Sequence, residues 1–292
     1  MAGTTGARSD AGRRLRACVL LAGHVGTTPL LKRIKRGVLD LPIDDRGSTL
    51  LDHWLGHTGG LAELLDRERL HMRVLDSHNG SYPAVPRPGV AFERDPVAYR
   101  GTGGIMRDAT AQYDPDDLVL FAAAGQYLTQ PLLNLWPLLS GRDADVTLIT
   151  HRDGTPSGLC LVRCGALREL PAAGFVDFKE QGLSIIGRHH SVVVVDLERA
   201  SSIPIRTHQQ YLHALRVHHE GSVERDLSPF DERWKPVFSV VEQGARVGAR
   251  ARVHNSVVLR GGVLEPSAIA VRSVICDGGQ VDKRGFAVDA VI

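Results

Sequence analysis

The feature that most constrains the fold is a six-residue recurrence of aliphatic side chains near the end of the chain, with glycines and small residues in the intervals. This period predicts a triangular parallel β-helix, in which each short strand contributes one inward aliphatic residue and three strands complete a coil of about eighteen residues. A run of ordinary short strands is the alternative. We expect Val247, Val253, Ile269 and Ile275 to point inward. The recurrent positions fall on two phases, namely Val241, Val247, Val253 and Leu259, then Val263, Ile269, Ile275 and Val281.

Before this region, short apolar runs alternate with amphipathic helical patterns, which predicts an α/β fold with a mainly parallel sheet and helices on both faces. The predicted strands cover residues 17–21, 72–75, 90–93, 118–123, 146–150, 159–162 and 191–196. The predicted helices cover residues 50–66, 104–113, 131–139 and 207–218. We therefore expect a mobile tail at residues 1–14, an α/β domain at 15–235 and a β-helix at 236–292.

Composition favours a soluble globular protein with small-molecule ligands. Hydrophobic residues make up 43% and charged residues 23% of the chain, so a full core is possible without disulfides or a metal. The chain has 35 basic and 33 acidic residues, so its net charge of +2 indicates neither a nucleic-acid-binding nor a membrane-binding surface. No segment approaches the roughly 20 apolar residues of a membrane span. The four cysteines are scattered and match no zinc or disulfide spacing, which favours a cytoplasmic location.

Two glycine-bearing segments indicate where a ligand with phosphate groups would bind. Leu21-Ala22-Gly23-His24-Val25-Gly26-Thr27 follows the first predicted strand directly, so backbone N–H groups can approach a phosphate with no Cβ between them. Gly101-Thr102-Gly103-Gly104 precedes a predicted helix. This second segment is either part of a ligand site or only a tight turn from strand to helix.

The order of these segments resembles that of the sugar-1-phosphate nucleotidylyltransferases. The first loop is similar to their Leu-Ala-Gly-Gly-x-Gly-Thr-Arg signature, and residues 36–43 to their Lys-Pro-Leu-Leu-Pro-Val strand. Residues 101–104 resemble Gly-Thr-Ala-Gly, residues 118–128 the strand ending in Asn-Gly-Asp, and residues 204–212 the Asp-Ile-Gly-Thr-Pro-x-x-Tyr-Leu turn and helix. A hexapeptide tail completes the order found in mannose-1-phosphate guanylyltransferases and ADP-glucose pyrophosphorylases.

The resemblance implies a Rossmann-like domain followed by a short left-handed β-helix, with a nucleoside triphosphate or nucleotide-sugar and a sugar phosphate as ligands. It places the nucleotide phosphates on Leu21, Ala22, Gly23, Gly26 and Thr27. The base and ribose would lie against Gly101, Thr102, Gly103 and Gly104, close to Gly125 and Gln126.

The chain departs from the family at its chemical centre. The two aspartates that hold Mg²⁺ in the family align with Gln126 and Pro204, and the loop arginine aligns with Thr28. Arg36 takes the position of the family lysine and remains a candidate phosphate contact. We consider Asp40, Asp108 and Asp196 as replacement acids, although Asp108 also suits a first helical turn and Asp196 a turn cap.

Two functions follow from the resemblance. The chain either forms a nucleotide-sugar and pyrophosphate, with Mg²⁺ and with Arg36, Asp108 or Asp196 in the catalytic site, or is an inactive regulatory or structural paralogue that pairs with an active partner. We expect a homo-oligomer or a hetero-oligomer, because the flat faces and the open end of a short coil leave apolar surface and unpaired edges. A β-helix acyltransferase is disfavoured because the tail has too few coils.

Overall fold

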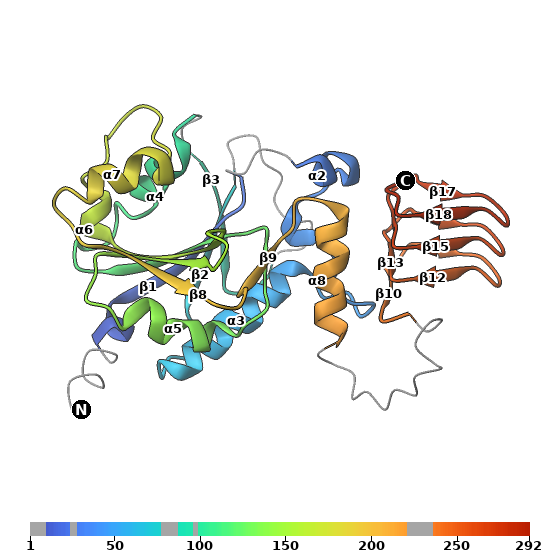
Figure 1. Ribbon diagram of the computed structural model, residues 1–292, viewed down its shortest axis with the longest axis horizontal. Coiled ribbons are helices and arrows are strands. Elements are labelled where there is room, and N and C mark those ends of the chain that lie inside the picture. Colours follow the sequence, from blue (N-terminus) through green and yellow to red (C-terminus); the bar gives the residue numbers. More distant parts are fainter. Residues whose placement is uncertain (1–9, 24–27, 77–86, 96–98, 221–235) are drawn as a thin grey trace. The chain divides into compact units, whose positions relative to one another are not determined.

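The computed structural model describes residues 10–23, 28–76, 87–95, 99–220 and 236–292 (Figure 1). The chain divides into two compact units, each built from separate stretches of sequence. The first unit comprises residues 1–26 and 54–202, and the second comprises 27–53 and 203–292. The domain boundaries expected at residues 14/15 and 235/236 stay predictions. In the described part of the chain, no helix is both long and apolar enough to cross a bilayer.

The first unit is organised around a seven-stranded sheet with the order β3-β2-β1-β4-β7-β6-β8. Only β7 runs against its neighbours, and the other pairs are parallel. The mainly parallel sheet predicted from alternating strands and helices is therefore confirmed. Its strands are β1 (Leu15–Leu21), β2 (His71–Asp76), β3 (Val90–Arg94), β4 (Leu118–Ala123), β6 (Val146–His151), β7 (Pro156–Arg163) and β8 (Val192–Leu197), and the short β5 (Gln126–Leu128) follows β4.

Helices cover both faces of this sheet (Figure 1). One face packs on α4 (Gly101–Ala109), α6 (Cys164–Leu167) and α7 (Leu183–Ile186), which follows the π-helical turn η2 (Phe178–Gly182). Their buried contacts join Val19 and Phe121 of the sheet to Ile105 and Leu167 of the helices. On the other face lie α3 (Leu50–Leu64) and α5 (Leu132–Ser140). α4 begins three residues before the predicted helix, so its glycines lie inside the helix.

The second unit contains a parallel β-helix of three coils, as the six-residue recurrence predicts. Each of its three sheets takes one strand from each coil. The strands are β10 (Ser239–Val241), β13 (Ser256–Val258) and β16 (Val274–Ile275); β11 (Arg246–Val247), β14 (Val263–Leu264) and β17 (Gln280–Val281); and β12 (Arg252–His254), β15 (Ile269–Val271) and β18 (Phe286–Val288).

Each coil takes seventeen residues rather than eighteen, since Val241 pairs with Val258 and Val258 with Ile275. Two steps of the coil are six residues long and the third is five. The inward positions therefore shift by one residue per coil relative to a strict period of six. This shift places Leu264 and Ala270 in the core of the coil, so the expectation that Ile269 points inward is wrong.

The other inward expectations differ in outcome. Ile275 is fully buried and Val253 packs against the same core. Val247 stands in one column with Leu264 and Val281, but it belongs to the first coil and is 41% exposed. Every coil also repeats three left-handed corner residues, at positions 244, 250 and 255 in the first coil and at the equivalent positions of the next two. Only the first of these corners is always glycine.

The remaining elements of the second unit precede the coil in the sequence. They are α2 (Pro29–Ile34), the 3₁₀ turn η1 (Val38–Asp40), β9 (Ser202–Pro204), whose residues from 203 onward belong to this unit, and α8 (His208–Glu220). Arg36 forms an ion pair with Glu242 of the coil at 2.9 Å. The Tyr211 hydroxyl donates a hydrogen bond to the Pro42 carbonyl, and the His219 ring stacks on Phe238.

Candidate functional site

The topology of the sheet marks one position for a ligand, at the carboxyl ends of β1 and β4. From β1 the chain first builds β2 and β3 on one side and then returns to place β4 on the other side. In open α/β sheets, ligands bind at such switch points, where the loops after two neighbouring strands diverge. Residues 21–23, which the sequence predicts to hold phosphates, follow β1 at this point.

Hydrogen bonds hold both sides of the switch point. The Ala22 N–H donates to the Leu75 carbonyl at 2.8 Å, and the Ala124 N–H donates to the Leu21 carbonyl at 3.1 Å. The indole N–H of Trp54 donates to the Ala124 carbonyl at 3.3 Å. Gly125 then makes the turn into β5. Of the predicted phosphate-binding residues, Gly26 and Thr27 lie outside the described part of the chain.

Gln126 lies beside this switch point and carries an unusual polar group. Its side chain is 7% exposed, and its buried Oε1 accepts no hydrogen bond from any residue that the structure describes. Gly158 of β7 has φ +84°, and a Cβ added there would lie 2.8 Å from the Gln126 Cγ, so glycine makes room for this side chain. Buried acceptors without a donor are uncommon and costly. The Gln126 amide is therefore the strongest local indication of a ligand.

The four residues at 101–104 contact the protein itself. A Cβ on Gly101 would lie 2.4 Å from the Val176 carbonyl, and the Gly103 N–H donates to that carbonyl at 2.9 Å. The Thr102 hydroxyl oxygen accepts the Phe178 N–H at 2.8 Å. A Cβ on Gly104 would lie 3.0 Å from the guanidinium carbon of Arg100. Close packing on residues 176–178 accounts for this segment, so its glycines do not by themselves indicate a nucleotide base.

Asp108 forms a two-point ion pair with Arg100. The Arg100 Nε lies 2.8 Å from Asp108 Oδ2, and its Nη2 lies 2.9 Å from Oδ1. Arg100 is buried, and this carboxylate raises its pKa above the ordinary arginine value. The arginine also donates to the Gly174 carbonyl at 2.8 Å. Asp108 therefore serves to fix the start of α4 against the 174–178 segment.

The other candidate acids and cations lie apart from the switch point or in the second unit. Asp196 is on β8, three strands from β4 in the sheet, and accepts a hydrogen bond from the Thr150 hydroxyl. Strand spacing of about 4.8 Å places it roughly 14 Å from β4. Arg36, Asp40 and Pro204 belong to the second unit. The structure thus brings together residues 21–23, 125 and 126, but not Asp108 or Asp196.

One carboxylate at the switch point, that of Asp76, is not among the site residues predicted from the sequence. Asp76 ends β2, next to the strand that carries Leu21, and follows Leu75, the residue bonded to Ala22. Its place at the end of a buried parallel strand was the signal that could have identified it. No group of three or more histidine, cysteine or acidic side chains in the described residues is arranged to hold a metal. The Gln126 amide offers a neutral oxygen where Mg²⁺ favours carboxylates, so these donors do not fit the family's metal site.

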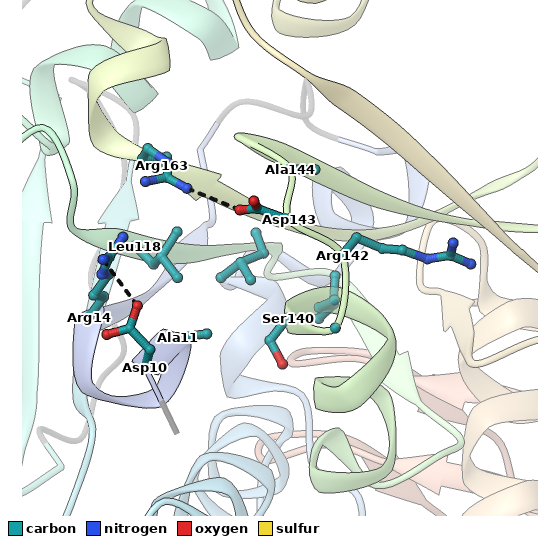
Figure 2. A pocket seen from close by; sticks show the side chains of 12 residues that line it. Asp10, Ala11, Arg14, Leu118, Ser140, Arg142, Asp143, Ala144 and Arg163 are labelled. Carbon is teal, nitrogen blue, oxygen red and sulfur yellow. Dashed lines mark ion pairs between the residues drawn. The ribbon is translucent and has the colours of Figure 1, made fainter. Parts of the chain in front are cut away.

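A cavity of about 290 Å³ lies at the other end of the strands from the switch point, by the first residue of β4 and the last residue of the antiparallel strand β7 (Figure 2). Leu118, Leu139 and Leu161 contribute apolar lining, and arginines contribute charge. Two of these arginines already have acidic partners: Arg14 is 3.0 Å from Asp10, and Arg163 is 3.9 Å from Asp143. None of the described residues that line the cavity is a site residue predicted from the sequence, and the cavity is separate from the switch point.

No known protein family and no curated protein matches the sequence. Among solved structures, HddC from Yersinia pseudotuberculosis aligns at 18% identity with a TM-score of 0.49, over 68% of this chain and 98% of its own. HddC complexed with GMP-PN aligns at 16% identity and a TM-score of 0.49 over the same shares. A homologue of Mycobacterium tuberculosis rv0371c from Mycobacterium sp. strain JC1 aligns at 18% identity and a TM-score of 0.46, over 69% and 95%. Similarity at this level establishes neither a shared fold nor a shared ligand.

Proposed function

We propose that the chain is a nucleotidylyltransferase-like protein that binds a nucleotide at the carboxyl ends of β1 and β4. The observation that carries this proposal is the buried Gln126 Oε1, which lacks a donor among the described residues at the point where the sheet topology favours a ligand. A base or ribose donor would satisfy this oxygen. The backbone at residues 21–23 would face the phosphates, in agreement with the resemblance of this loop to the family signature.

In this proposal, binding survives and catalysis is weak or absent. Transfer of a nucleotidyl group requires the charge on the α-phosphate and on the leaving pyrophosphate to be neutralised. Gln126 is neutral, and Asp108 is engaged by Arg100. A chain with these features would act as a nucleotide- or sugar-phosphate-responsive partner of an active enzyme. This is the inactive-paralogue alternative that the sequence leaves open.

An active transferase is the second candidate, and Asp76 is the observation that favours it. Asp76 is the last residue of β2, the strand that pairs with β1, at the carboxyl ends of the strands where the nucleotide phosphates are proposed to lie. It would supply one oxygen ligand to a Mg²⁺ that is held otherwise by the substrate phosphates and water. Mg²⁺-dependent pyrophosphate release that is lost in Asp76→Asn would establish this candidate.

The test of binding compares the native chain with Gln126→Leu by calorimetric titration with ATP, GTP, CTP and UTP, each with and without Mg²⁺. Loss of a buried hydrogen bond costs about 1 to 3 kcal/mol, so we expect affinity for the preferred nucleotide to fall by roughly 5- to 100-fold. Gln280→Leu, at an exposed position in β17, is the matched control. Equal affinity of Gln126→Leu and the native chain would remove Gln126 from the site.

Turnover is measured on the same proteins with a panel of sugar-1-phosphates. We expect little or no pyrophosphate from the native chain, although a nucleotide binds. Gln126→Asp restores one carboxylate at the position that aligns with a family aspartate, and a gain of activity in this variant would support a lost metal ligand. Robust native turnover that is independent of Asp76 would contradict both the binding-only proposal and the second candidate.

A further inference from the structure

The outer edge of β8 is a pairing surface in the first unit. Strand β8 ends the seven-stranded sheet, and no other strand of the described chain pairs with its free side. Its register with β6 runs without a bulge from Val192 to Leu197. Four consecutive valines, at positions 192–195, occupy this edge, and Val194 is 52% exposed. Proteins usually protect an exposed edge with lysine, proline, a bulge or a covering element, and these four positions contain no lysine, proline or bulge.

The free backbone groups of this edge can be assigned. The Ser191 carbonyl accepts the Val146 N–H, and the Leu197 carbonyl accepts the Arg152 N–H, both from the β6 side. In a parallel ladder, alternate residues direct their N–H and C=O groups to the same neighbour. Odd-numbered residues of β8 therefore bond to β6. The backbone groups of Val192, Val194 and Asp196 point to the outer edge.

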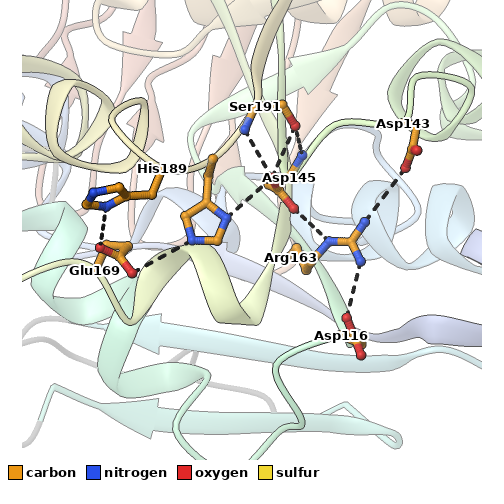
Figure 3. Close-up of polar contacts among 8 residues, drawn as sticks. Asp116, Asp143, Asp145, Arg163, Glu169, His189 and Ser191 are labelled. Atoms are coloured by element: carbon orange, nitrogen blue, oxygen red, sulfur yellow. Dashed lines mark hydrogen bonds and ion pairs between the residues drawn. The ribbon is translucent and has the colours of Figure 1, made fainter.

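The amino end of this strand is held rigidly by polar contacts (Figure 3). The Asp145 carboxylate accepts the Ser191 N–H at 3.0 Å and the Ser191 hydroxyl at 3.1 Å. Arg163 lies 2.8 Å from Asp145, and His190 bridges Asp145 at 3.3 Å and Glu169 at 3.8 Å. Asp145 and Glu169 thus both have basic partners. A strand fixed in this way loses little conformational freedom when another strand pairs with it.

The charges near the two ends of β8 favour a second copy of this chain, paired in the antiparallel direction. Arg188, in the turn between α7 and β8, and Glu198, just after β8, are exposed, and neither side chain has an ion-pair partner among the described residues. A second copy that approaches antiparallel brings Arg188 of one strand toward Glu198 of the other. The parallel arrangement would place like charges side by side, which is unfavourable.

We propose that two copies of this chain associate through antiparallel pairing of their β8 edges, with the two-fold axis at Val193. In this register, Val192 of each copy faces Val194 of the other, and both use their outward backbone groups. The end of β8 near Arg188 in one copy then lies toward the Glu198 end of β8 in the other. The two Val193 residues form the pair without mutual hydrogen bonds, where opposite side chains come closest. An interface of this kind is isologous and closes at two copies.

A cysteine at position 193 tests the register directly. Opposite residues of such a pair lie about 4.5 Å apart at Cα, within the range of a disulfide. We expect Val193→Cys to form a disulfide-linked dimer under mild oxidation. Val195→Cys is the matched control, since the two cysteines would lie four residues apart along the strand, roughly 13 Å. The native cysteines are buried and do not compete. Failure of Val193→Cys to cross-link, or equal cross-linking of both variants, would overturn the proposal.

The second measurement is sedimentation of uncross-linked variants across a range of concentrations. Val194→Lys places a charge on the exposed edge, and we expect the dimer dissociation constant to rise about tenfold or more. Leu64→Lys, also 52% exposed but on α3, is the control and should leave that constant within about twofold. A native chain that is monomeric, or a dimer that persists unchanged in Val194→Lys, would contradict pairing through β8. If two copies associate through the β-helix instead, the dimer persists unchanged in Val194→Lys.

Discussion

His57 is a half-buried histidine that makes the first unit sensitive to acid. Its Nδ1 accepts the Leu132 N–H at 3.3 Å, and burial lowers its pKa to about 4 from the ordinary value of 6.5. The unfolded chain therefore binds a proton at higher pH than the folded chain does. The contribution of His57 to stability is constant above pH 6.5, is lost as pH drops from 6.5 to 4, and changes no further below 4. The loss amounts to at most about 3 kcal/mol.

We predict that His57→Asn reduces this acid sensitivity, because the asparagine oxygen retains an acceptor for Leu132 but does not titrate. Urea unfolding between pH 7.5 and 4.5 should show a flatter stability profile in the variant. His71→Asn, at an exposed position of β2, should keep the native profile. Burial and His219 also lower the pKa of His218, so some acid sensitivity remains in the second unit. An unchanged profile in His57→Asn would contradict the prediction.

At individual residues, the sequence predicts which backbone positions are unusual but not what approaches them. The glycine at 101 is required because its φ is +70° and because the Val176 carbonyl lies where a Cβ would be. A ligand phosphate would leave the same signature in the sequence. Gln126 was predicted as a residue near the nucleotide and as a lost aspartate, but its unpaired buried oxygen packs against Gly158, more than thirty residues away. Contacts over such separations are set by tertiary packing, which local sequence patterns do not encode.

At the scale of the element, the sequence predicts the strands of the sheet closely because each is a short apolar run with a clear end. The β-helix is also predicted, but the positions that point inward are not all predicted correctly. The predicted pattern, two six-residue phases with a slip between Leu259 and Val263, assigns Leu259, Val263 and Ile269 to the core. The five-residue step of the coil places Val258, Leu264 and Ala270 there instead. Ala270 and Ala287, paired at the middle of β15 and β18, carry only a weak hydrophobic signal, so the inward positions are not recognised where they fall on these alanines.

The inward and outward positions of the coil lead to a prediction on two neighbouring residues, Leu264 and Val263. Leu264 is 1% exposed in the core of the coil, and Val263 lies on the opposite side of the same strand. We expect Leu264→Ala to lower the free energy of unfolding by about 2 to 5 kcal/mol, because it leaves a cavity. Val263→Ala should cost less than about 1 kcal/mol. Denaturant unfolding of both variants measures the difference, and a larger cost for Val263→Ala would favour the predicted pattern that places Val263 inward.

At the scale of the whole molecule, two units are built from interleaved stretches of sequence. Residues 27–53 belong with 203–292 rather than with the strands on either side of them. Composition does not change at residues 27 or 53, so the sequence gives no sign of this division. The Arg36–Glu242 ion pair is one of its physical causes, and it joins positions 206 residues apart. Arg36, which the sequence predicts to contact phosphate, therefore has a structural role in this ion pair.

These two roles of Arg36 predict different results for Arg36→Ala. Its guanidinium is 22% exposed and Glu242 is 16% exposed, so the variant leaves a half-buried carboxylate without this partner. We expect the stability of the second unit to fall by about 1 to 3 kcal/mol. Hydrogen–deuterium exchange should accelerate in residues 28–53 and 236–292 but not in β1 and β4, and Lys32→Ala, at an exposed position of α2, should change neither. Loss of nucleotide affinity with native exchange rates would instead return Arg36 to the phosphate site.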